Sequence, residues 1–404
     1  MIRRRLIFFC GVSISLGPCG GFDGVLRHFF IILIRARWVS AHRVVYCLGD
    51  SILFRAIFLC MIMLVIKVRL IVPRRELATP FDLCCRYSAA SFLMMKSKGW
   101  EEGFVDRFQN ELLKSVKEKY ERAGGHAEYE CEQSGPDKSA RQFYVRNLRD
   151  NFVRSMDSCH EEQYRRGSGR ELDDKMRALR SSSAMTFNLI GNKYCVIDEN
   201  DLGLPHGRYS VEYEHQVPTL KIRGGAPANI DAWLKSDCAG GVVVACELKM
   251  MEWLTSNSSL LKDKYLDPAN YSHGMGDVFA GLAEKLKLGG FVRYDWAQMF
   301  KHTVALMNEM LGRRCGERIS TLVLLNVVWE PVRPTLHQAM TERYYEMLLQ
   351  EHGEFGFKEI MEPAKALFMD LCGVDFSIEY RNAFEFAHMI QRDDAEWHKL
   401  ERYF

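Results

Sequence analysis

The run GGVVVACELK, residues 240–249, constrains the fold more than any other stretch of the chain. A glycine pair followed by branched apolar residues is typical of the start of a buried strand. Side chains alternate along a strand, so one face is apolar throughout, with Val242, Val244, Cys246 and Leu248. The other face begins with Val243 and Ala245 and ends with Glu247 and Lys249. Unpaired charges are costly to bury, so this strand end is either a solvated salt bridge or a site that needs both charges.

A second run, NIDAWLKSD at 229–237, predicts a neighbouring strand with Asp231 on the face opposite Ile230. A hairpin between the two runs would place Asp231 beside Glu247 and Lys249. Two adjacent carboxylates raise each other's pKa, and they are stabilised together when they share a hard cation such as Mg²⁺. The cation would activate water, and Lys249 would offset charge developing at a phosphorus atom. These residues therefore suit the hydrolysis of a phosphodiester.

The remaining periodicities predict an α/β or α+β domain built on a mixed sheet flanked by helices. Helical spacing predicts helices at 101–123, around 141–156, over 171–190 before Gly191, and at 295–311. Alternating or continuous apolar runs predict strands at 207–217, 229–237, 242–249 and 319–331, with one more near DFSIEY at 375–380. The three strands between 207 and 249 follow one another closely, as in an antiparallel meander.

Charge divides the chain near residue 95. Residues 1–95 carry a net charge of +9, whereas the remainder carries −7, which together give the overall +2. The basic segment has three interpretations: a targeting or membrane-associating sequence, a poorly ordered extension, or a stretch outside the functional protein that begins at Met94 or Met95. Its apolar run at 56–66 is shorter than the roughly 20 residues of a membrane-spanning helix, so no stable span is expected. Residues 96–404 are expected to form a single domain with its core at 175–330.

Cysteine spacing predicts no zinc framework. The thirteen cysteines include seven beyond residue 95, and none of these seven forms a C-x-x-C pair. The twelve histidines contain no H-x-x-x-H pair. Free thiols in a reducing compartment, and hence a cytoplasmic location, are the expectation.

Four pieces in order resemble one family: SSSAMTFNLIG (181–191), ANIDAWL (228–234), CELKMMEW (246–253) and YDWAQMFKH (294–302). They are similar to the PD-(D/E)xK nuclease superfamily, with its restriction-endonuclease-like fold, and within it to a branch of bacterial-type proteins. The resemblance covers roughly residues 175–330. Two departures are that no proline precedes Asp231 and that Ser183 replaces the glutamine of the branch. The first helix also offers no obvious inward-facing glutamate.

The resemblance implies roles for individual residues. Asp231 and Glu247 would bind Mg²⁺ or Mn²⁺, Lys249 would serve catalysis, and Glu214 or Glu212 would supply a further acid. Gln298 and His302 are i,i+4 neighbours on a helix that would face the site. They would then contact a substrate phosphate, unless they lie on an ordinary solvated face. Glu252 is either a further ligand or a cap of the following segment.

Two functions remain open at this stage: a metal-dependent nuclease, or an inactive protein of the same fold that binds DNA or another protein. The net acidic charge of residues 96–404 argues against a broad non-specific nucleic-acid surface. A local basic cleft remains compatible with it, for which the candidates are Lys221, Arg223, Lys301, Arg313 and Arg314. DNA is the expected partner rather than RNA, and a homodimer is left open.

Overall fold

The computed structural model describes the chain in ten stretches: 98–130, 141–167, 171–198, 200–221, 227–238, 240–254, 260–312, 319–331, 338–353 and 356–404. The structural statements that follow concern these residues, which belong to the unit Met94–Phe404. The predicted N-terminal extension, residues 1–95, lies outside them.

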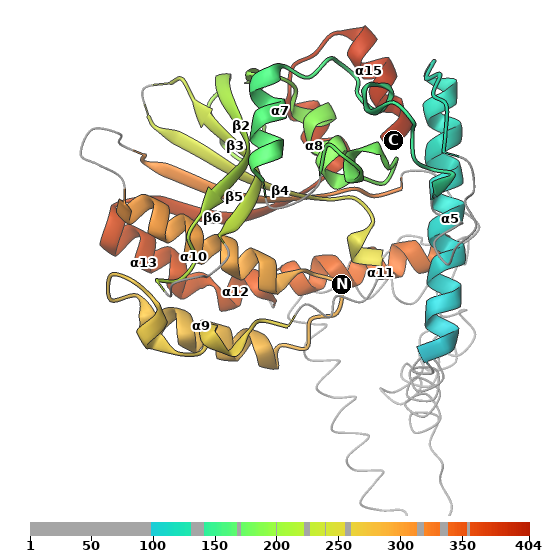
Figure 1. Ribbon diagram of the computed structural model, residues 1–404. Coiled ribbons are helices and arrows are strands. Elements are labelled where there is room, and N and C mark those ends of the chain that lie inside the picture. Colours follow the sequence, from blue (N-terminus) through green and yellow to red (C-terminus); the bar gives the residue numbers. More distant parts are fainter. Residues whose placement is uncertain are drawn as a thin grey trace, which may run out of the picture. The chain divides into compact units, whose positions relative to one another are not determined.

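A six-stranded mixed sheet forms the centre of this unit, in the order β1-β2-β3-β4-β5-β6 (Figure 1). The strands are β1 Tyr194–Ile197, β2 Gly207–Val217, β3 Ala228–Ser236, β4 Val242–Lys249, β5 Thr321–Val328 and β6 Asp375–Asn382. The first four strands pair antiparallel, whereas β5 and β6 run parallel to β4. The predicted class, a mixed sheet flanked by helices with β4 in its interior and β5 beside it, is therefore confirmed.

Helices cover both faces of the sheet, as Figure 1 shows. One face is covered by α7 Ser158–Arg166, α8 Ser182–Ile190 and α14 Ala383–Met389. The opposite face is covered by α10 Trp296–Gly312 and α13 Glu362–Cys372, with α9 Gly276–Leu288 and α12 Phe357–Ile360 packed outside them. The remaining helices are α5 Lys98–Arg122, α11 Gln338–His352 and α15 Asp394–Leu400. This two-sided cover explains why β4 and β5 are almost entirely apolar.

The predicted helix around 141–156 is wrong. Only the short 3₁₀ turn Leu148–Asn151 forms there. The backbone instead pairs with residues farther along the chain: Val145 N–H donates to the Arg177 carbonyl, and the Asn151 side chain donates to the Met176 carbonyl. These long-range bonds satisfy the polar groups that a local helix would otherwise use.

The predicted helix over 171–190 begins much later than expected. Ser181 caps α8, its hydroxyl accepting the Ala184 N–H at 3.1 Å, and the segment before it holds only the 3₁₀ turn Lys175–Arg177. Gly191 ends the helix as predicted. The sheet also extends beyond the predicted core at 175–330, since β6 lies at 375–382. Two elements, β1 and α9, were not predicted from the sequence.

Candidate active site

The hairpin of β3 and β4 brings the predicted carboxylates together. Ala232 pairs with Cys246, so the next residues along the ladder, Asp231 and Glu247, lie side by side. Asp231 Oδ2 accepts the backbone N–H of Leu248 at 2.8 Å, which fixes its carboxylate against the end of β4. The geometry expected from strand alternation is therefore present.

Glu247 is the centre of a buried polar network between β4 and α10. Its side chain is 1% exposed, yet both oxygens have partners. Oε1 accepts from Lys249 Nζ at 2.8 Å and from Gln298 Nε2 at 2.7 Å. Oε2 lies 2.8 Å from His302 Nε2. The Lys249 ammonium also donates to Gln298 Oε1 at 2.6 Å, which links the three partners into one cluster.

The partners, rather than burial, set the charge of Glu247. Burial by itself raises the pKa of this carboxyl, but the charges and hydrogen bonds of Lys249 and His302 outweigh it and hold the pKa at about 2. Burial, followed by the charge of Glu247, raises the pKa of Asp231 well above its ordinary value. The neighbouring acids, Glu247 above all, outweigh the effect of burial on Lys249 and raise its pKa. The pKa values of two adjacent carboxyls are thus shifted in opposite directions.

Glu214 is the acid of β2 that turns toward this cluster. Its backbone has φ +50°, an uncommon value for a residue other than glycine. At Glu214, opposite Asp231, the regular pairing of β2 with β3 is interrupted. Asn229 Nδ2 donates to Glu214 Oε2 at 3.1 Å. Burial, and then the charges of Glu171 and Glu247, raise the pKa of Glu214 to about 7. The alternative acid, Glu212, instead pairs with His215 at 3.0 Å on a half-exposed part of the strand.

Glu171 belongs to the same acidic cluster, and the sequence did not reveal it. It lies before α8, where no inward-facing glutamate was expected. Its carboxylate accepts hydrogen bonds from Ser183 Oγ at 2.8 Å and from Lys175 Nζ at 2.7 Å. Its charge raises the pKa of Glu214, which places it near that residue. The sequence feature that could have pointed to Glu171 is its i,i+4 spacing from Lys175, just before the serines at 181–183.

The other candidate residues have local structural partners or lie outside the described chain. Glu252 accepts the Met250 N–H at 2.7 Å, as expected if it organises the following 3₁₀ turn Glu252–Leu254. Lys301 is half-buried on α10, and Lys221 is exposed. Arg223, Arg313 and Arg314 are not among the described residues.

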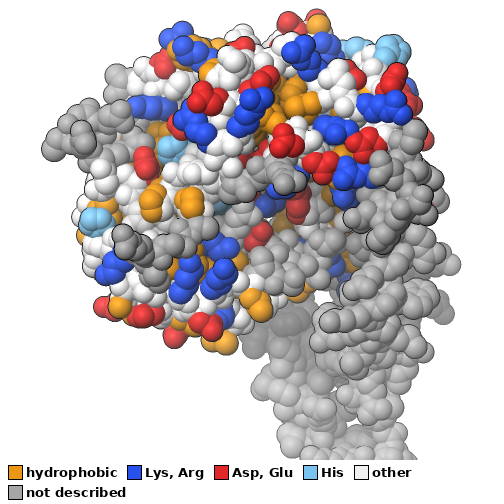
Figure 2. Space-filling view, in the orientation of Figure 1, with side chains coloured by type: hydrophobic (Ala, Val, Ile, Leu, Met, Phe, Trp, Pro, Cys, Tyr) orange, Lys and Arg blue, Asp and Glu red, His pale blue; other side chains and the backbone are white. Residues whose placement is uncertain are grey.

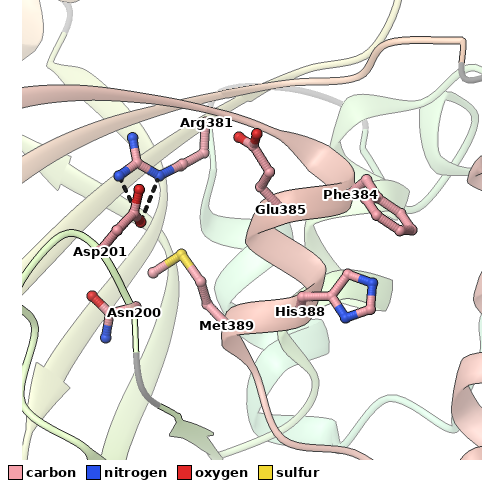
Figure 3. A pocket seen from close by; sticks show the side chains of 7 residues that line it. All are labelled: Asn200, Asp201, Arg381, Phe384, Glu385, His388 and Met389. Atoms are coloured by element: carbon pink, nitrogen blue, oxygen red, sulfur yellow. Dashed lines mark hydrogen bonds and ion pairs between the residues drawn. The ribbon is translucent and has the colours of Figure 1, made fainter.

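A cavity of about 350 Å³ opens at the carboxyl end of β6 (Figure 3). Parallel register aligns Arg381 in this cavity with Val327 and, one strand farther, with Leu248. Arg381 is paired there with Asp201 at 2.7 Å. The cavity thus lies at the same end of the sheet as Glu247, but none of the predicted site residues lines it.

The fold and this arrangement of charges define a protein of the restriction-endonuclease-like class. A family model described as "restriction endonuclease associating with ARP" matches residues 114–359, and the chain belongs to that family. No curated protein and no solved structure matches it significantly. Within the described part of the chain, no helix has both the length and the apolar character that crossing a membrane requires.

Proposed function

We propose that this protein is a divalent-metal-dependent nuclease whose reaction takes place at the paired ends of β3 and β4. The observation that carries the proposal is the convergence of Asp231, Glu247 and Lys249, supported by the family to which the chain belongs. A carboxylate pair with an adjacent ammonium supplies the groups that phosphodiester hydrolysis needs: oxygen ligands for a cation and a positive charge directed at the reacting phosphate.

The side chains at this site fit a divalent cation. Asp231 and Glu247 would hold it, because their oxygens are hard ligands and their proximity penalises two negative charges, as the raised pKa of Asp231 indicates. The carboxylate oxygens of Asp231, Glu247 and Glu214 are not all within 4.8 Å of one another. Glu214 is therefore not proposed as a third ligand, and two side chains would hold the ion. Bound Mg²⁺ or Mn²⁺ would supply Lewis acidity toward the phosphate.

The residues around these ligands have separate proposed roles. Lys249 would orient the attacking water and stabilise negative charge on the phosphate, since it remains protonated at neutral pH. Gln298 and His302 would act as positioning residues, because each already holds one oxygen of Glu247. Glu214, with a pKa of about 7, would exchange a proton during the reaction.

A group of lysines next to the site supports nucleic acid as the substrate, with DNA as our specific proposal. Burial lowers the pKa of Lys301, Asp295 opposes this effect, and the charges of Lys262, Lys264 and Lys249 lower the pKa further, so each of these three lysines acts on Lys301. Figure 2 shows Lys and Arg side chains gathered over α10 and α9. Clustered lysines bind the phosphates that flank a scissile bond without reading sequence.

The test combines cleavage with metal-dependent stability. Purified protein is incubated with single- and double-stranded DNA and RNA in Mg²⁺ or Mn²⁺, and its melting temperature is measured with and without each ion. We expect cleavage, and stabilisation of about 2.7 kcal/mol when the ion is at a hundredfold its Kd. Asp231→Asn should abolish both, whereas Asp237→Asn on the β3–β4 turn should leave both unchanged. An active protein without any thermal response to the ions would contradict the assignment of the ligands.

An inactive protein of the same fold is the second candidate, and one observation favours it. Both oxygens of Glu247 are already hydrogen-bonded to side chains, so a cation must compete with Lys249 for Oε1. Absence of cleavage and of thermal response, together with retained binding of a DNA duplex, would establish this second function.

The N-terminal extension and the oligomeric state also remain proposals. We propose that residues 1–93 are dispensable for folding, as the change in charge near residue 95 suggests. Deletion to Met95 should leave a protein that unfolds cooperatively at an unchanged melting temperature. A large fall in the melting temperature of the deleted protein would show that the extension is an integral part of the fold. Light scattering on the same sample tests whether the protein forms a homodimer.

A further inference from the structure

Three potential metal ligands lie close together at the start of α7, which follows the 3₁₀ turn Leu148–Asn151 in the chain. Asp157, Cys159 and His160 each offer one donor atom, and these atoms all lie within 4.8 Å of one another. Among the described residues, no other group of three or more such side chains meets this condition. The spacing D-x-C-H matches neither the C-x-x-C nor the H-x-x-x-H pattern, so motif spacing does not predict this group.

The distances are close to those of a tetrahedral metal centre. Cys159 Sγ lies 3.8 Å from His160 Nδ1. With a metal–sulfur bond of about 2.3 Å and a metal–nitrogen bond of about 2.0 Å, tetrahedral geometry separates the two ligand atoms by about 3.6 Å. A metal ion can therefore join sulfur and nitrogen after a shift of a few tenths of an ångström, and the exposed Asp157 side chain is free to rotate toward it.

His160 is held in the orientation that a ligand needs. Its side chain is only 1% exposed, and its ring packs edge-on against Tyr213 with the centroids 5.2 Å apart. The imidazole also hydrogen-bonds to the backbone of Val211. This hydrogen bond and the packing against Tyr213 hold the ring in place.

Asp157 does not use its carboxylate as an N-cap aspartate ordinarily does. It occupies the N-cap position of α7, and an N-cap aspartate usually accepts a backbone N–H of the first turn. Here its side chain makes no capping hydrogen bond, and its backbone N–H donates to Asn192 Oδ1 at 3.2 Å. The positive end of the helix dipole opposes a cation at this place. A carboxylate and a thiolate together balance the two charges of a divalent ion and offset that effect.

We propose that Asp157, Cys159 and His160 bind one Zn²⁺ ion, with water in the fourth position. A thiolate and an imidazole select zinc over Mg²⁺, which prefers oxygen ligands alone. The site is separate from the proposed nuclease centre and does not depend on it. Zinc would hold the N-cap and the first turn of α7 together. The helix in turn holds β2 one residue from Glu214, since Gln163 Oε1 accepts the Tyr213 N–H at 2.9 Å.

Cobalt substitution tests the proposal, because a Co²⁺–thiolate bond gives a charge-transfer absorption that oxygen ligands do not. The full-length protein is stripped with a chelator and titrated with Co²⁺, and Zn²⁺ is then added to displace it. We expect the band to appear with one equivalent, to disappear on addition of Zn²⁺, and Zn²⁺ to raise the melting temperature. Asp157→Asn should weaken Co²⁺ binding at least about tenfold.

The chain has thirteen cysteines, so matched variants locate the signal. Cys159 and Cys238 are both exposed, and substitution of either by serine should leave the fold intact by circular dichroism. Cys159→Ser should lose the band, whereas Cys238→Ser and Asp231→Asn should keep it. No band in the wild type, or a band that survives Cys159→Ser, would overturn the proposal. A band together with absent nuclease activity would leave the zinc site standing and reject only the nuclease.

Discussion

Glu247 on β4 and Glu214 on β2 belong to one acidic cluster, and the more buried of the two is the stronger acid. Glu247 is almost inaccessible to solvent, yet Lys249 and His302 keep its pKa at about 2. Glu214 has no cation that outweighs its burial, so burial, and then the charges of Glu171 and Glu247, raise its pKa to about 7. Burial raises the pKa of both acids, and the sign of the charges next to each one decides whether that rise is reversed or reinforced.

The same contrast separates two possible duties within the proposed reaction. A carboxylate that stays negative at every physiological pH is suited to hold a cation. An acid with a pKa of about 7 is suited to exchange a proton. Substitutions on one side of the pair should therefore change one duty and leave the other intact.

The largest expected effect is on catalysis. Lys249→Ala removes both a hydrogen bond to Glu247 and the positive charge proposed to face the phosphate, so kcat should fall by about 10²–10³. Metal binding should persist, because an ammonium is not a ligand. Lys287→Ala, which removes a surface pair with Asp263, is the matched control and should leave kcat unchanged. Wild-type rates in Lys249→Ala would remove the lysine from the mechanism.

The next effect is a pH dependence of stability that originates in Glu214. Its pKa rises from 4.5 unfolded to about 7 folded, so the folded state binds the proton more tightly. The free energy of unfolding should therefore fall as pH rises from about 4.5 to about 7, by up to about 3 kcal/mol, and then level off. Urea unfolding in a chelator measures it. Glu214→Gln should flatten this slope, whereas Glu212→Gln should retain it.

A smaller loss of stability is expected on the Glu247 side. His302→Ala removes the partner of Glu247 Oε2, and a hydrogen bond to a charged group contributes about 2 kcal/mol. The same substitution in a Glu247→Gln background should cost less, since the remaining group is then neutral. Equal losses in the two backgrounds would mean that His302 acts by packing alone. His206→Ala, at an exposed ring, serves as the control.

The smallest effect concerns the space around Glu214. A Cβ added at Gly167 would lie 2.7 Å from Glu214 Oε2, so Gly167→Ala must displace the carboxylate. Because that atom ends a flexible side chain, the free energy of unfolding should fall by less than about 1 kcal/mol. Gly281→Ala, inside α9 with nothing within 4 Å of the added atom, should instead raise it by up to about 1 kcal/mol. Differential scanning calorimetry distinguishes the two signs.

Strand alternation in the sequence was enough to predict the carboxylate pair. The apolar face of 242–248 fixed which side Glu247 and Lys249 occupy, and the short turn before Gly241 fixed the hairpin that brings Asp231 to them. These features are local, since the period of a strand and the length of a turn follow from neighbouring residues. The helices at 101–123 and 295–311 were equally readable, because each has a continuous apolar stripe.

The wrong predictions fell where distant segments supply the hydrogen bonds. Residues 141–156 form no helix because their polar groups pair with residues 176–178 and with Asn188. The helix predicted from 171 begins at Ser182, and the freed segment places Glu171 against Ser183. No periodicity within a window of a dozen residues contains this information.

The order of residues along the chain specifies which side chains alternate, where the buried strands run, and which acids and lysine share the end of a sheet. What those groups contact, and how their pKa values shift, depends on how the helices and strands pack. Gln298 and His302, some fifty residues beyond Glu247, close on its two oxygens only when α10 packs on β4. Charge interactions depend on distance through space and on exclusion of water, and neither quantity is written in the order of residues along the chain.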